Sequence, residues 1–198
     1  MDVFEVMETC RAIRYLKPDP VPEELITKLV WAATRAPSPG NSQGWDIVVV
    51  TEPEPKAAIG AAIEAAMAAR LDGNTDTGER SSTLMLRGAL NLARTIGSAP
   101  VLVLMCGGVV YPPQAPDERF TWSAIYPAAQ NLILAARALG LGSTFTTFHH
   151  VAEPTIRAVL GIPAEIRIGA MIPVGWPDRP FGPVNRNPVE SFVHRDRW

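Results

Sequence analysis

Hydrophobic positions along this chain follow two patterns, one typical of amphipathic helices and one typical of buried strands. Helical spacing predicts helices at residues 3–11, 22–35, 56–71, 80–95, 121–139 and 154–160. Short apolar runs predict strands at 47–50, 101–105, 143–148 and 166–174, and the polar stretch 71–79 predicts an exposed loop. Helices and strands follow one another without an internal repeat, so the pattern predicts a single α+β domain over residues 1–198.

Three segments indicate how the domain is assembled. Residues 121–139 are apolar almost all round, so this helix must be buried on several sides, at the centre of the fold or against a second copy of the chain. The proline-rich tail from Gly175 to Trp198 has little periodicity, and we expect it to wrap over a partner subunit. The proline-containing loop from Gly107 to Glu118 is expected to be a lid or a surface excursion.

Composition narrows the function classes. The hydrophobic content of 47% is enough for one substantial core, and a net charge of −2 with interspersed signs offers no basic stripe for nucleic acid or a membrane surface. Cys10 and Cys106 lie far apart and match no disulfide scaffold or metal-ligand spacing. The N-terminus is acidic and no apolar run is long enough to span a bilayer, so we expect a cytoplasmic protein.

Common catalytic motifs are absent from the sequence. It contains no phosphate-binding GxxxxGK[ST], no GxSxG elbow and no HExxH, and residues 140–143 (GLGS) follow a helix and lack the third glycine of a dinucleotide fingerprint. His149 and His150 are expected to point to opposite sides of a strand, so no shared metal is predicted. Arg11 and Arg14 lie three residues apart and would share a face at a helix end, either as solvated surface arginines or as an anion site.

A rigid loop of small and polar residues stands directly before the strand at 47–50, an arrangement that lets backbone approach a ligand closely. With it occur, in order along the chain, the segments Cys10-Arg11-Ala12-Ile13-Arg14, Pro20-Val21-Pro22, 36–45 (APSPGNSQGW), 130–142 (QNLILAARALGLG), Gly175-Trp176-Pro177 and Arg186. Together these segments resemble the FMN-dependent nitroreductase family over nearly the whole chain.

The resemblance implies a nitroreductase-like α+β fold, with a central mixed or antiparallel sheet flanked by helices, and an intertwined homodimer with FMN at the interface. In this family pattern Arg11 and Arg186 would bind the FMN phosphate, and Arg14 would face the pyrimidine edge of the flavin ring. The other implied cofactor-binding residues are Ala12 beside the arginines, Asn91 and Arg94 near the same ring edge, Pro37, Ser38, Pro39 and Asn41 from the second subunit, and Thr144, Phe145 and Thr146 near flavin N5. For Asn91 and Arg94 an ordinary exposed helix face is the alternative.

The implied activity is a ping-pong transfer of hydride from NADPH or NADH, through flavin N5, to a small nitroaromatic or quinone-like acceptor. That chemistry requires no side-chain acid or base, which agrees with the absence of a catalytic triad. Two alternatives stay open: a flavin-binding protein without turnover, and another flavin reaction on the same fold, such as reductive dehalogenation or flavin fragmentation.

The chain departs from the family pattern at Cys10, Ala12, Gly44 and Val184, where arginine, serine, proline and lysine are usual. Two phosphate contacts are lost in this way. Because a charge-assisted hydrogen bond contributes about 1.5 to 3 kcal/mol, FMN is expected to bind roughly ten- to a thousandfold more loosely than in relatives that retain both.

Overall fold

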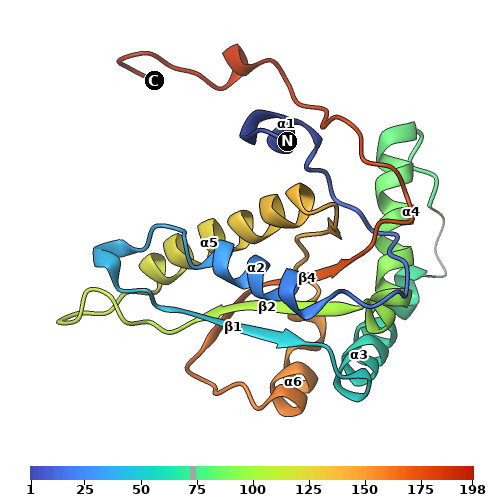
Figure 1. The fold of residues 1–198 in the computed structure, drawn as a ribbon, viewed down its shortest axis with the longest axis horizontal. Coiled ribbons are helices and arrows are strands. Elements are labelled where there is room, and N and C mark those ends of the chain that lie inside the picture. Colours follow the sequence, from blue (N-terminus) through green and yellow to red (C-terminus); the bar gives the residue numbers. More distant parts are fainter. Residues whose placement is uncertain (72–74) are drawn as a thin grey trace.

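A four-stranded antiparallel sheet with the strand order β1-β2-β4-β3 lies at the centre of the protein (Figure 1). The computed structural model describes residues 1–71 and 75–198, so part of the expected loop at 71–79 lies outside the described residues. The strands are β1 (Trp45–Val50), β2 (Val101–Gly107), β3 (Gly142–Ser143) and β4 (Arg167–Gly175). The helices are α1 (Val3–Thr9), α2 (Glu23–Ala33), α3 (Pro53–Leu71), α4 (Arg80–Thr95), α5 (Glu118–Ala138) and α6 (His149–Leu160), with short 3-10 turns η1 (Pro39–Asn41), η2 (Ile96–Ser98) and η3 (Val189–Ser191).

Each face of the sheet supports its own core, and β2 contributes to both. Val101, Val103 and Met105 pack with α2 and α5. The alternate residues Leu102 and Leu104 pack with α3, α4 and α6 on the other face. Every residue of β2 is buried, which confirms the prediction that this continuous apolar run forms a strand covered on both sides.

The long helix α5 is buried as its apolar sequence predicts. Ala128, Ala129 and Leu132 are completely inaccessible to solvent, and the helix packs against α2 and the sheet. Pro127 lies inside this helix. The loop before α5 extends beyond the end of the sheet, as Figure 1 shows, so the expectation of a surface excursion is confirmed.

The predicted strand 143–148 is wrong after Ser143. Thr144 does not pair with β4, because its hydroxyl donates to the carbonyl of Ile13 at 2.6 Å. After Ser143 this segment contacts β4 only through an isolated β-bridge between Thr146 and Met171. Helix α6 then begins at His149, before the predicted start at residue 154. A non-helical residue inside it, Ala152, interrupts the periodicity and hides this first turn from the sequence pattern.

The two adjacent histidines therefore lie in a helix and not in a strand. The rings of His149 and His150 are 4.1 Å apart, so the expectation that they point to opposite sides is wrong. The same helical start buries His149 completely.

The N-terminal helix is also shorter than predicted. Helix α1 ends at Thr9, and the following residues run extended because the amide of Ile13 donates to the carbonyl of Ser143 at 2.9 Å. Arg11 and Arg14 thus project from an extended segment and not from the end of a helix.

The C-terminal tail runs beside this N-terminal segment (Figure 1). The amide of Lys17 donates to Trp176, that of Asp178 to Tyr15, and that of Val184 to Glu8. Beyond this stretch the tail is exposed, with Trp198 fully open to solvent. Among the described residues no helix combines the length and the apolar character needed to cross a membrane.

Candidate functional site

Two adjoining cavities lie where the extended segment 10–15 meets the tail and α4. The first has a volume of about 400 Å³ and is lined by Cys10, Arg11, Ala12, Arg14, Pro183, Val184, Asn185 and Arg186. The second has a volume of about 420 Å³ and is lined by Arg11, Ala12, Ile13, Arg14, Tyr15, Leu84, Arg87, Gly88, Arg179 and Pro180. Arg11, Ala12 and Arg14 belong to both, so the cavities form one arginine-lined cleft.

Arg14 is half-buried between the cavities and packs against α4 at Gly88. A Cβ atom at Gly88 would lie 3.2 Å from Cδ of Arg14, so the glycine provides the space for this side chain. The side-chain amide of Asn91 donates to the backbone carbonyl of Arg14 at 3.2 Å and fixes the segment on the helix. A glycine inside a helix lowers helix stability by about 1 kcal/mol relative to alanine. At Gly88 this loss of helix stability accompanies the space that the Arg14 side chain needs.

The electrostatics of Arg14 favour an anion in the cleft. Burial, and then the positive charge of Arg11, lower the pKa of Arg14, whereas Tyr15 acts in the opposite direction. The ion pairs of the described residues join Arg119 to Asp117, Arg157 to Glu153 and Arg167 to Glu118, and none of them includes an arginine of the cleft. Guanidinium groups gathered in this way are suited to phosphate or carboxylate.

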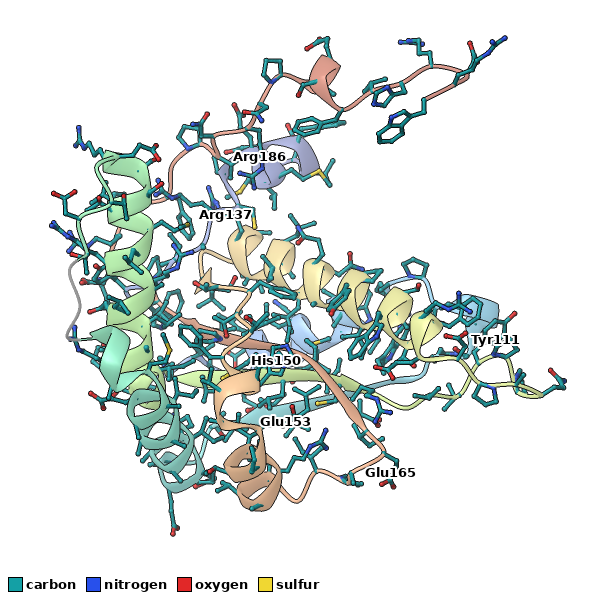
Figure 2. The ribbon with its side chains drawn as sticks, turned by 180° about the vertical axis from the view of Figure 1, so that it is seen from behind. Tyr111, Arg137, His150, Glu153, Glu165 and Arg186 are labelled. Carbon is teal, nitrogen blue, oxygen red and sulfur yellow. The ribbon has the colours of Figure 1, made fainter. Side chains whose placement is uncertain are left out.

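The tail that carries Arg186 is fixed by contacts with α1 and α5. The amide of Val184 donates to the carbonyl of Glu8 at 2.8 Å. Arg137, near the end of α5, donates from Nε to Thr9 Oγ1 at 2.9 Å, and its guanidinium lies 4.0 Å from the ring centroid of Phe181. Figure 2 shows Arg137 and Arg186 at the same end of the molecule.

The structure brings together one group of the residues predicted for the cofactor. Arg11, Ala12, Arg14 and Arg186 line the cleft, and Asn91 supports Arg14 through its carbonyl. Arg94 is exposed on α4 and lines neither cavity.

Residues 144–146 line neither cavity, and Thr144 contacts the cleft only through Ile13. Thr144 is buried and bonded to Ile13, a residue of the second cavity, whereas the Thr146 hydroxyl donates to Met171 at 2.9 Å. Phe145 is exposed, and its ring centroid lies 6.0 Å from that of Tyr126 on α5.

A second group of predicted residues, Pro37, Ser38, Pro39 and Asn41, lies elsewhere. These residues form the loop around η1, which packs against Tyr111 through Gly40. Gly40 and Asn41 adopt positive φ angles of 58° and 51°, and the Ser38 hydroxyl accepts from the amide of Gln43 at 3.0 Å. Figure 2 places Tyr111 at the opposite end of α5 from Arg186, so a single chain does not bring the two groups together.

Sequence reasoning missed Arg87 and Arg179, which line the second cavity. Arg87 donates from Nε to Thr75 Oγ1 at 3.1 Å, and the Arg179 guanidinium lies 4.9 Å from the Tyr15 ring centroid. Arg87 precedes Asn91 by four residues on α4, so helical periodicity places both side chains on one face of the helix. The predicted role of Asn91 could therefore have pointed to Arg87. Within the described ranges, no three His, Cys, Asp or Glu side chains are grouped so as to hold a metal ion.

Comparison with known proteins gives a consistent result. The family model described as the Nitroreductase family matches residues 8–176. The chain is 31% identical to NADH dehydrogenase of Thermus thermophilus, covering 92% of this chain and 90% of that protein. It is 34% identical to 5,6-dimethylbenzimidazole synthase of Rhodospirillum rubrum, covering 84% and 78% of the two. It is 28% identical to iodotyrosine deiodinase 1 of Rattus norvegicus over 90% of this chain, which spans 63% of that relative's length.

Solved structures with the same fold include an iodotyrosine deiodinase bound to FMN and 3-iodo-L-tyrosine, with a TM-score of 0.78, 21% identity and full coverage of both chains. The FMN and NADPH-dependent nitroreductase NfnB from sphigopyxis sp. strain HMH gives a TM-score of 0.76 at 20% identity, again over both whole chains. The predicted α+β fold of the nitroreductase type is confirmed.

Proposed function

Because this chain belongs to the nitroreductase family, we propose that it is an FMN-dependent oxidoreductase that passes hydride from NADPH or NADH to a small nitroaromatic or quinone-like acceptor. The proposal rests above all on the arginine cleft, in which Arg11, Arg14 and Arg186 converge from opposite ends of the sequence. The name of the Thermus relative and the FMN bound in a structure of the same fold support it.

The residues of the cleft fit FMN. Arg11 and Arg186 line the first cavity and would hold the phosphate, whose charge of about −2 suits a pair of guanidinium groups. Arg14, between the cavities, would face the ring edge on which negative charge develops upon reduction. FMN, when bound, would supply the hydride-transfer chemistry, and the protein would bind and orient the reactants and stabilise charge.

The cleft also agrees with weak retention of FMN. Cys10, Ala12 and Val184 line the first cavity, and they stand where the family pattern usually has arginine, serine and lysine, so two phosphate contacts are lost. Burial raises the pKa of the Cys10 thiol, whose Sγ donates to the carbonyl of Ile133 at 3.7 Å, so this side chain stays uncharged and does not replace the positive charge of the usual arginine.

A homodimer would complete the site. The loop 37–41 lies far from the arginines of its own protomer, so it would serve the cofactor only through the cleft of a second copy. The proposed assembly is therefore a dimer with FMN at the interface, to which each protomer gives its arginine cleft at one end and its η1 loop at the other.

The proposal is tested by an absorbance spectrum of the FMN-loaded protein, followed by anaerobic reduction of the bound FMN with NADPH or NADH. Protein purified with added FMN should be yellow and dimeric, should be bleached anaerobically by NADPH or NADH, and should recover its colour with menadione or a nitrofuran. A protein that binds FMN but is not bleached by either nicotinamide would contradict the oxidoreductase proposal and favour a binding role or a different flavin reaction. A colourless monomer that is indifferent to added FMN would overturn the proposal entirely.

A further inference from the structure

The arginine cleft contains more positive charge than one FMN phosphate requires. Arg87 on α4 and Arg179 in the tail line the second cavity, and neither lines the first cavity with Arg186. Both side chains are exposed, so they lie where a reactant from solvent would first meet the cleft.

The second cavity has the chemistry of a site for an anion attached to an apolar ring. Its lining includes Ile13, Leu84 and Pro180 as well as arginines, and it includes no carboxylate. Leu84 is more than half exposed, so it adds apolar surface to the lining of this cavity. Arginine forks bind phosphate through two hydrogen bonds at once, and an arginine is the usual partner of the 2′-phosphate of NADP.

We propose that Arg87 and Arg179 form a clamp for the 2′-phosphate of the nicotinamide reductant, and that this clamp makes the enzyme prefer NADPH to NADH, which lacks that phosphate. The inference rests on the proposed function, because it names the reductant that would use the same cleft. Arg11, Arg14 and Arg186 would remain with FMN, so the two sets of arginines have separate roles.

The clamp is tested with the FMN-loaded protein and the variants Arg87→Gln and Arg179→Gln. Lys28→Gln is a matched control, because it removes one exposed positive charge from α2 and lines neither cavity. For the wild type we expect kcat/KM to be at least about tenfold higher with NADPH than with NADH. One charge-assisted hydrogen bond to the additional phosphate changes an equilibrium constant by about tenfold or more. Each clamp variant should lose most of this preference, and the control should keep it.

A binding measurement gives a readout that does not depend on turnover. Calorimetry with adenosine 2′,5′-bisphosphate should show about tenfold weaker binding to either clamp variant, while the dissociation constant of FMN changes less than about threefold. Equal use of NADPH and NADH by the wild type would overturn the clamp and leave the proposed function intact. Loss of FMN affinity in the variants with an unchanged nucleotide preference would also overturn it, because the arginines would then belong to the flavin. If neither nicotinamide is oxidised, the proposed function fails, and the bisphosphate titration still decides whether the clamp exists.

Discussion

At the scale of single residues, Arg14 is the residue of the cleft at which charge and burial oppose each other. Its guanidinium is half-buried beside the like charge of Arg11, and the interactions that shift its pKa include no carboxylate. Burying a charge without a partner is unfavourable, and an anionic ligand removes that penalty.

Replacement of this cation should therefore separate stability from binding. Arg14→Met keeps the aliphatic packing against Gly88 and should leave the FMN-free protein as stable as the wild type, or more stable by up to about 1 kcal/mol. The same change should weaken FMN binding by about tenfold or more. Urea denaturation and fluorescence titration with FMN measure the two effects, and a clear loss of stability without FMN would contradict the argument.

His149 is the second residue at which burial of a titratable group is informative. It is fully buried, and within the described part of the chain neither ring nitrogen has a hydrogen-bond partner of good geometry, although the backbone of Ile168 lies near enough to favour the protonated form slightly. Burial, followed by the neighbouring His150, lowers the pKa of His149 to about 4 from an ordinary value of 6.5, so the folded protein holds it neutral.

This lowered pKa predicts acid sensitivity. Between about pH 6.5 and pH 4 the unfolded chain binds a proton at this position and the folded protein does not, so the free energy of unfolding falls as the pH falls. The loss from this group between pH 7 and pH 5 should be about 2 kcal/mol. Urea unfolding of His149→Leu should lack this part of the pH dependence, whereas the exposed-site control His194→Gln should retain it.

The sequence predicted which arginines share one cleft where the signal was local, and it was less informative where the position depends on rotation about a helix; the cofactor roles of these residues stay predictions. Arg11, Arg14 and Arg186 converge as the motif order predicts. The prediction for Arg94 rests on its distance along the sequence from the strand at Val101, and that distance does not say which side of α4 faces the cleft. Arg87 occupies that side.

At the scale of elements, the tail depends on α5 for its position. Arg137 holds Phe181 beneath its guanidinium and bonds Thr9 of α1, so the segment that leads to Arg186 is attached to two helices. A stacked cation of this kind contributes about 0.5 to 2 kcal/mol.

Removing this attachment should loosen the cofactor without unfolding the domain. Arg137→Met is expected to weaken FMN binding about three- to tenfold, because the tail must then be ordered when the ligand binds. Limited proteolysis should cut the tail of the variant faster than that of the wild type, while the urea midpoint changes little. Unchanged FMN affinity together with faster cleavage would show that the tail does not position the phosphate site.

Helix α3 packs closely on η2 through two glycines. A Cβ atom at Gly60 would lie 2.7 Å from the Cα of Gly97, and backbone atoms cannot yield as a flexible side chain can. Gly60→Ala should therefore lower the free energy of unfolding by about 1 to 3 kcal/mol, although alanine is the better helix former. Ala61→Ser, at an exposed position of the same helix, should stay within about 0.5 kcal/mol in the same urea experiment.

Element types were predictable wherever one periodicity extends over many residues. Helix α4 and strand β2 occupy the expected positions because their patterns are unbroken. The segment 143–148 has strand composition, yet Thr144 bonds the carbonyl of Ile13, more than a hundred residues away. A hydrogen bond between residues so far apart in the sequence, which replaces strand pairing at Thr144, cannot be recognised from a local sequence pattern.

At the scale of the whole molecule, the two groups of predicted site residues lie at opposite ends of α5 in a single chain. In the proposed dimer each cofactor would use the arginine cleft of one copy and the η1 loop of the other. A variant with a damaged cleft and a variant with a damaged loop should then form mixed dimers that contain one intact site.

Arg11→Gln should damage the cleft, and Pro37→Trp, at an exposed loop position, should block the loop. Each variant alone should lose FMN-dependent activity. Random exchange of subunits yields half heterodimers, each with one intact site, so the mixture should regain about a quarter of the wild-type activity. Activity that stays at the level of the separate variants would contradict a site shared between subunits.

The position of β2 between the two cores has a consequence for how the protein moves. Its strand is paired with β1 on one side and with β4 on the other, and all of its residues are buried. Its amide hydrogens should therefore exchange with deuterated solvent only when the whole domain opens, whereas those of the exposed tail should exchange within local fluctuations. The segments that would admit and release small molecules can thus rearrange many times during the lifetime of a single folded sheet.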